Sequence, residues 1–162
     1  MGIYEWLSIA LICVAGATTP GPSVLVIIYI NNTRGFLSGI IASLAHGLGI
    51  FIYALISIYT ISLIDKNLPS IIPLIQLMGA IFLIFFGYKM MFFKTNKKNI
   101  NKNYIISKKV TDSFFLGLTT SLINPKIIIF FISIFSQFIN NDFNDYNKVG
   151  IGLLAGIIDT FW

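Results

Sequence analysis

The first residues that could do chemistry form a double-proline break inside an apolar stretch. Residues 6–30 are almost entirely apolar except at one short sequence, which contains Thr19, Pro20, Gly21 and Pro22. Each proline removes a backbone hydrogen bond from a helix and clashes with the preceding turn. Because hydrocarbon offers the freed carbonyl groups no partner, such a break is stable in a membrane only where it lines a cavity or is buried in protein. The sequence therefore predicts a helix that is interrupted at a functional cavity.

A second break repeats this arrangement and adds a charge. Asn124 and Pro125 stand midway in the apolar stretch 113–139, and Lys126 follows them directly. Lys126 is about 14 residues from either end of that stretch, roughly 20 Å from each interface, which is too far for its side chain to reach water. A charge at that depth costs several kcal/mol unless it is paired or faces a water-filled cavity. We expect Lys126 to line such a cavity; a neutral lysine that the fold tolerates is the alternative.

Two further titratable residues are predicted to lie deep in apolar segments. Asp159 stands 11 residues after Lys148, and His46 stands 12 residues after Arg34. Asp159 could form an ion pair with Lys126, and a pair that opens on protonation could couple transport to protons. The alternatives are a static structural partnership for Asp159 and, for His46, a buried imidazole bonded to a neighbouring carbonyl.

The elements that must position these residues are transmembrane helices. Of the 162 residues, 56% are hydrophobic and only 10% are charged, and the mean hydropathy is +0.86. A soluble domain carries roughly a quarter charged residues, so a lipid bilayer must solvate much of this chain. The gaps between charges predict four spans and the start of a fifth near Val149, the four being residues 6–31, 37–62, 70–93 and 113–139.

The two breaks fall in the first and fourth spans, so that three spans make one half of the pattern. An odd number of spans per half inverts the second half relative to the first. We therefore predict an all-α polytopic membrane bundle, an inverted repeat of three helices whose first and fourth helices are interrupted. Residues 1–93 form the first repeat, residues 94–111 a lysine-rich loop, and residues 112–162 a second repeat. The second repeat is expected to be incomplete, because the chain stops within the fifth span.

Charges between the spans predict the orientation. Residues 94–109 contain six lysines and no acidic residue, and the short link at Arg34 is also positive, so both are expected in the cytoplasm. The N-terminus with Glu5 and the segment with Asp142 and Asp145 are then expected outside a bacterial inner membrane. Small residues also recur at every fourth position, a spacing that favours close helix packing within the bundle or, alternatively, in a homodimer. They are Gly35, Gly39, Ser43 and Gly47 in the second span, and Gly152 and Gly156 in the fifth.

The remaining pattern excludes several classes of function. The chain has no phosphate-binding loop, no metal-ligand spacing and no nucleophile elbow, so we expect neither an enzyme nor a metal or cofactor. Six of its eleven basic residues cluster in one loop, with Tyr104 as the single aromatic among them, so nucleic acid is not an expected partner. Cys13 is the only cysteine, which excludes a disulfide framework.

Paired interrupted helices instead predict a secondary transporter whose site lies near the membrane midplane. The helix N-terminus after each break suits a carboxylate, and the carbonyl groups freed before each break suit an ammonium group or a proton carrier, so a zwitterion fits. An ion gradient remains as the energy source, since no nucleotide site is present. The predicted residues for binding substrate or coupling ion are Thr19, Pro20, Gly21, Pro22, His46, Asn124, Pro125, Lys126 and Asp159.

Three segments resemble one family. "TPGPSVLVI", "GFLSGIIASLAHGLG" and "GLTTSLINPKIIIFFISIFSQF" follow in this order and are similar to the lysine exporter superfamily of LysE/RhtB type, which includes threonine and homoserine exporters. The resemblance covers nearly the whole chain and implies a six-helix inner-membrane exporter of amino acids or related metabolites, driven by the proton gradient. It gives functional weight to both breaks, to Lys126 and to Asp159. Members usually carry an acidic or otherwise polar residue where this chain has Ser23, and they extend through a sixth helix.

The expected substrate is a neutral amino acid, because a basic one would want a deep carboxylate beyond Asp159 and the sequence shows none. Three alternatives stay open. A passive channel would carry a flux that ignores the proton gradient. A membrane scaffold or thiol relay would transport nothing, although a relay needs paired cysteines. A truncated, inactive product is the third.

Overall fold

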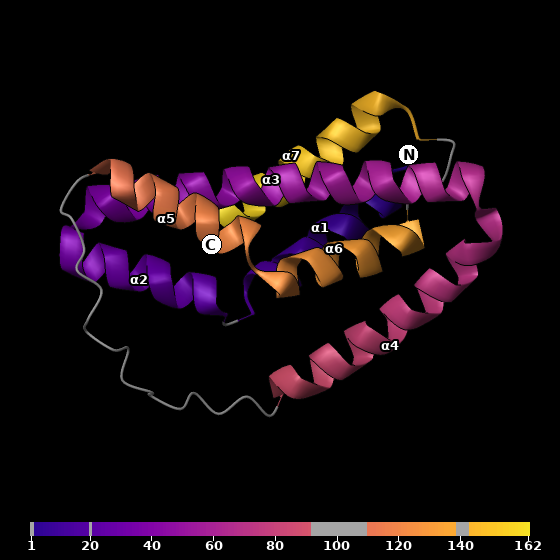
Figure 1. Ribbon diagram of the computed structural model, residues 1–162, viewed down its shortest axis with the longest axis horizontal. Helices are drawn as coiled ribbons and strands as arrows, with labels where there is room; N and C mark the ends of the chain where they lie inside the picture. Colours follow the sequence, from indigo (N-terminus) through magenta and orange to yellow (C-terminus); the bar gives the residue numbers. More distant parts are fainter. Residues whose placement is uncertain (1, 20, 92–109, 139–142) are drawn as a thin grey trace.

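The computed structural model describes residues 2–19, 21–91, 110–138 and 143–162, and within these ranges every regular element is helical (Figure 1). The predicted all-α class is therefore confirmed. The predicted loop of residues 94–111 lies outside the described residues except for its last two positions, which begin α5. The elements are α1 (Ile3–Ala17), α2 (Pro22–Arg34), α3 (Phe36–Asn67), the short 3-10 helix η1 (Pro69–Ile71), α4 (Ile72–Met91), α5 (Val110–Leu122), α6 (Pro125–Phe138) and α7 (Asp145–Phe161).

Both predicted helix breaks are confirmed, and each following helix begins at a proline. α1 ends at Ala17 and α2 begins at Pro22, and the two helices are bent by 63° relative to each other. α5 ends at Leu122 and α6 begins at Pro125, with a bend of 51°. Proline suits the first position of a helix because its fixed φ is helical and its missing N–H would have no partner there. Pro20 lies outside the described residues, so its predicted role stays a prediction.

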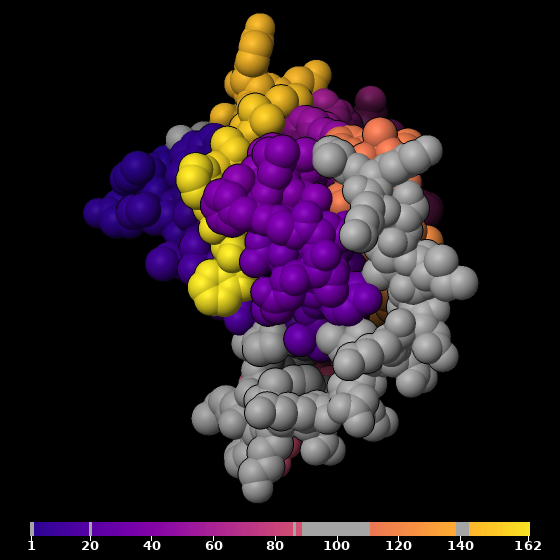
Figure 2. Space-filling view, turned by 90° about the vertical axis from the view of Figure 1, so that its left-hand side faces the viewer, coloured from indigo at the N-terminus to yellow at the C-terminus, as the bar shows by residue number. Residues whose placement is uncertain are grey.

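The longest helix, α3, packs against α2, α5, α6 and α7, while α1 packs on α7 and α4 on α6. In Figure 1, α2 and α5 lie along one end of α3, and α6 lies toward the other end, so each bent pair runs the length of α3 and breaks near its middle. Figure 2 faces the end where α2 meets α3, and it shows α7 between α1 and α3. The breaks are thereby brought to one level of the bundle.

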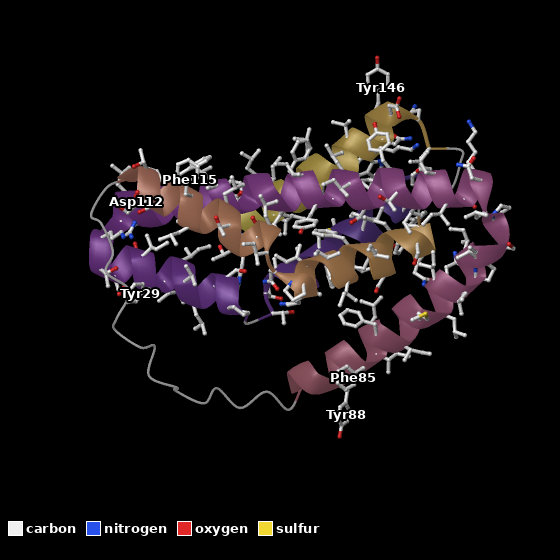
Figure 3. The ribbon with its side chains drawn as sticks, viewed as in Figure 1. Tyr29, Phe85, Tyr88, Asp112, Phe115 and Tyr146 are labelled. Atoms are coloured by element: carbon white, nitrogen blue, oxygen red, sulfur yellow. The ribbon has the colours of Figure 1, made fainter. Side chains whose placement is uncertain are left out.

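By length and composition, α3 is the one described helix that could cross a bilayer by itself. Counting each bent pair as one span raises the number to three within the described part of the chain. α4 is a shorter apolar helix at the position of the third predicted span. Phe85 and Tyr88 point from α4 away from the other helices, as side chains that face lipid would (Figure 3).

Of the predicted small-residue seams, Gly47, Gly152 and Gly156 pack where α3 crosses α7, and Gly39 packs against Asn31 of α2. A Cβ added to Gly47 would lie 2.7 Å from the carbonyl oxygen of Gly156, and one added to Gly156 would lie 2.8 Å from the carbonyl oxygen of Gly47. Neither position has room for a methyl group, so the two backbones are in direct contact. On another side of α3, Gly117 of α5 lies against the backbone of Ala42. Gly35 differs from these, because it is the turn between α2 and α3 and its φ of +94° is one that L residues rarely adopt.

The apolar core lies among α1, α3, α6 and α7. Its fully buried members include Ile9, Ile58, Phe135 and Ile151, one from each of these helices. Phe131 stacks on Phe135 with ring centroids 5.2 Å apart. This core lies next to the breaks and holds the helices that carry the deep titratable residues.

Candidate functional site

A pocket lies where the two breaks face each other. Its lining comes from α1, α2, α3, α6, α7 and both breaks, which are far apart in the sequence. Six of the nine predicted site residues line it: Thr19, Gly21, His46, Asn124, Lys126 and Asp159. Pro22 and Pro125 are the first residues of the helices beside it and do not line it. The pocket therefore gathers residues that the sequence placed at similar depth in four different segments.

At the first break, the N-terminus of α2 opens toward the pocket without a side-chain cap. Gly21 is its N-cap residue in an extended conformation, and no side chain caps the helix in the described part of the chain. Ser23 and Val24 follow in the first turn and line the pocket. The amide N–H groups of a first helical turn have no partner within the helix, and they carry the positive end of its dipole. This backbone is suited to bind an anion.

Lys126 connects the second break to the first. Its Nζ lies 3.4 Å from the carbonyl oxygen of Thr19, to which it donates, and 3.4 Å from the position that a Cβ on Gly21 would take. An ammonium group thus stands beside the positive end of α2. Two positive features at one place attract a negatively charged group, and a carboxylate has the geometry to accept from both.

The second break is closed by its own asparagine. Asn124 Oδ1 accepts the backbone N–H of Lys126 at 3.1 Å, so that the asparagine caps α6. The N–H of Asn124 donates to the carbonyl of Ser121 at 3.4 Å. The N-terminus of α6 is therefore already capped, in contrast to that of α2.

Hydroxyl groups satisfy the carbonyl groups that this second break leaves without helical partners. Ser23 Oγ donates to the carbonyl of Thr120 at 3.4 Å and accepts from Asn124 Nδ2 at 3.0 Å. Tyr53 Oη of α3 donates to the carbonyl of Leu122. In the sequence, Ser23 stands out only as a departure from the family pattern, and no pattern singles out Tyr53. The signal for Ser23 was its position directly after a proline break, where a short hydroxyl can reach a loosened backbone.

Asp159 is paired with His46. His46 Nδ1 and Asp159 Oδ2 are 2.6 Å apart, while His46 Nε2 is buried and has no hydrogen-bond partner among the described residues. The sequence suggested Lys126 as the partner of Asp159 and a backbone carbonyl as the partner of His46. The structure describes a carboxylate–imidazole pair, because His46 adjoins Gly47 and Asp159 follows Gly156 by three residues, and the suggested ion pair of Asp159 with Lys126 stays a prediction. The close crossing of α3 and α7 brings the two side chains together.

The rest of the lining is mainly apolar. Ile50, Ile127 and Phe131 contribute hydrocarbon, and Cys13 is a buried free thiol. No group of three His, Cys, Asp or Glu side chains in the described ranges could hold a metal ion. The arrangement thus combines an ammonium group, an uncapped helix N-terminus and a carboxylate within a mostly apolar wall. It can bind a small molecule that carries both signs of charge.

Comparison with known proteins gives one consistent family. The model of the family described as LysE type translocator matches residues 14–160. The threonine efflux protein of Escherichia coli K12 is 26% identical over 159 residues, which cover 97% of this chain and 77% of that protein. The leucine efflux protein of Klebsiella pneumoniae is 24% identical over 139 residues, covering 86% of this chain and 65% of that protein. No solved structure matches the chain.

Proposed function

Because the chain belongs to the LysE type translocator family, and is a membrane transporter rather than an enzyme, we propose that it exports amino acids across the bacterial inner membrane. Its preferred substrates are neutral amino acids, and inward proton flow drives the export. Relatives that are named for threonine and leucine efflux support this substrate class.

The observation that carries the proposal is the chemistry of the pocket lining. Lys126 and the uncapped N-terminus of α2 offer donors for a carboxylate, and Asp159 offers an acceptor for an ammonium group. An α-amino acid carries both groups on one carbon atom. A carboxylic acid or an amine alone would leave one side of this lining without a partner, and such a deficit costs about 1–3 kcal/mol.

The preference for neutral side chains follows from the charge count of the lining. Asp159 is the single carboxylate among the described lining residues, and the ammonium group of any amino acid would occupy it. A cationic substrate side chain would then lie without a counter-charge in an apolar environment, which is strongly unfavourable. Ile50, Ile127 and Phe131 instead suit a small or apolar side chain.

The layout of the two bent helix pairs supports alternating access between two inverted repeats, residues 1–93 and 112–162. Each pair is broken near the middle of α3, where a midplane site would lie. The N-terminus faces outward and the lysine-rich loop 94–111 faces the cytoplasm in this proposal, which the lysines of that loop support.

Efflux from loaded cells tests the proposal. Cells that express the chain are loaded with labelled threonine or leucine, and loss of label is followed with and without a protonophore. Faster efflux than in cells with empty vector, and its slowing by the protonophore, is the expected result. Equal rates with and without the chain would overturn the function, and a rate that ignores the protonophore would favour a passive channel.

Lys126→Ala tests the site within the same assay. We expect it to reduce efflux to the empty-vector rate while the chain still inserts into the membrane, because the carboxylate loses its charged donor. Lys148→Ala is the matched control, since Lys148 lies near the start of α7 outside the pocket lining and contacts the ring of Tyr59. Normal efflux by Lys126→Ala would show that the site assignment is wrong.

A further inference from the structure

We propose that the His46–Asp159 pair is the site at which a proton and the ammonium group of the substrate exclude one another. The inference rests on the proposed function, and it names the residues that couple export to the proton gradient. It is drawn from the geometry of the pair and from the number of charges that the pocket can hold.

The pair presents one proton-accepting nitrogen and one accessible carboxylate. With His46 Nδ1 within 2.6 Å of Asp159 Oδ2, a neutral imidazole donates its N–H to the carboxylate through Nδ1. Nε2 then carries a lone pair without a partner in the described part of the structure, and it is the nitrogen that can take up a proton. Asp159 keeps 18% of its side-chain surface exposed and lines the pocket, so a ligand can reach it.

The charge of the His46–Asp159 pair makes the proton and the substrate ammonium group competitors. A neutral His46 with an ionised Asp159 carries a net charge of −1, which either one proton or one ammonium group neutralises. Binding both would place an imidazolium and an ammonium group beside the single Asp159 carboxylate of a mostly apolar pocket, while the substrate carboxylate is bound at Lys126 and the start of α2. In such a low dielectric, like charges repel strongly, so the doubly occupied state is disfavoured. Proton uptake therefore releases the substrate, and substrate binding releases the proton.

Few other titratable groups face this pair. Lys126 comes from α6 and Cys13 from α1. The described parts of α2 and α5 contribute no titratable side chain to the lining. Lys126 is matched by the substrate carboxylate when an amino acid is bound, so the exclusion depends on the pair itself. Cys13 adds none when it is protonated, as a thiol in an apolar environment is.

The fold makes the exchange of proton and substrate depend on a movement of the helices. His46 Nε2 is buried in this conformation, and the backbones of Gly47 and Gly156 hold α3 and α7 in contact beside it. A proton reaches Nε2 only when the surrounding helices shift. Loading and unloading therefore belong to different conformations, which is what coupled export requires.

The test is the linkage between pH and binding, measured on the purified full chain in detergent. The Kd for labelled threonine and for labelled leucine is measured from pH 5 to pH 8, and proton release on binding is followed with a pH dye in weak buffer. We expect the affinity to fall as the pH falls, approaching tenfold per pH unit at the acidic end, where one proton leaves for each amino acid bound.

Two substitutions identify the groups. His46→Gln keeps an N–H for the carboxylate but cannot take up a proton, so proton release per bound amino acid should fall to near zero, whatever happens to the affinity itself. Asp159→Asn should weaken binding at every pH. Asp145→Asn, the same change on the same helix outside the pocket, should keep the pH dependence of the unsubstituted chain. Melting temperatures show which variants are folded.

The outcomes separate this inference from the function on which it rests. A Kd that does not change with pH in the unsubstituted chain overturns the inference and leaves amino-acid binding intact. Undiminished proton release in folded His46→Gln also overturns it. Failure of either amino acid to bind at any pH, together with no efflux from loaded cells, overturns the proposed function itself.

Discussion

The two helix breaks look alike in sequence, but their backbones are satisfied in different ways. At the second break, Asn124 caps α6, and hydroxyls of Ser23 and Tyr53 bond two of the carbonyls that precede it. At the first break, no side chain caps α2 in the described residues, although threonine hydroxyls bond the carbonyl of Ala15. The second break is therefore capped by side chains, whereas the described residues leave the first turn of α2 without a side-chain cap, where we propose that the substrate carboxylate binds.

This difference indicates how one repeated motif can serve two purposes. A proline break always frees backbone groups, and what happens to them depends on the nearest side chains. Where an asparagine and two hydroxyls are in reach, the break becomes rigid. Where a glycine stands at the cap position, no side chain of that residue caps the amide groups of the first turn.

The largest expected effect comes from adding a carboxylate side chain at the first break. Gly21→Asp would place a carboxylate at the N-cap of α2 and near Lys126, where the substrate carboxylate is proposed to bind. We expect efflux to fall about tenfold or more, since charge-assisted hydrogen bonds contribute about 1.5–3 kcal/mol. At the same time, the melting temperature should rise slightly, because aspartate stabilises an N-cap by roughly a few tenths of a kcal/mol relative to glycine.

Gly21→Ala is the matched control for this substitution. Its Cβ would meet Lys126 Nζ at 3.4 Å, an ordinary contact, so efflux should change little. If Gly21→Asp transported normally, the uncapped N-terminus of α2 would not be the carboxylate site, and the functional contrast between the breaks would disappear.

A smaller effect, mainly on stability, is expected from removing the side-chain cap at the second break. Asn124→Ala removes the cap of α6 and the donor to Ser23, and should reduce the free energy of unfolding by about 1–3 kcal/mol. Thermal unfolding in detergent measures it. Asn124→Asp restores the acceptor for the Lys126 N–H and should recover part of the loss. A melting temperature that Asn124→Ala leaves unchanged would contradict this capping role.

The smallest effect is expected at Tyr53. Tyr53→Phe leaves the Leu122 carbonyl without its hydroxyl donor, and this should cost about 1 kcal/mol of stability while leaving the pocket lining unchanged. Tyr29→Phe is the control, because Tyr29 points outward from α2 (Figure 3). Equal melting temperatures for the two variants would show that the Tyr53 hydroxyl does not stabilise this break.

The sequence predicted the breaks and the six polar or break residues named above that line the pocket, because prolines and charges inside apolar stretches have few explanations in a membrane. It did not predict the partner of Asp159. Counting residues along a span gives the depth of a side chain but not the direction in which it points around the helix. That direction depends on the crossing of Gly47 and Gly156, whose spacing was visible in the sequence while their pairing was not.

The same crossing restricts how substrate range can change during evolution. Gly47 and Gly156 cannot accept even alanine without moving a backbone, so the α3–α7 side of the pocket is closed to gradual variation at these positions. Substitutions are easier at apolar lining residues from other helices, such as Val24 in α2 and Ile127 in α6. Transporters that descend from such a chain would diverge in selectivity through these residues, while keeping the histidine–aspartate pair in place.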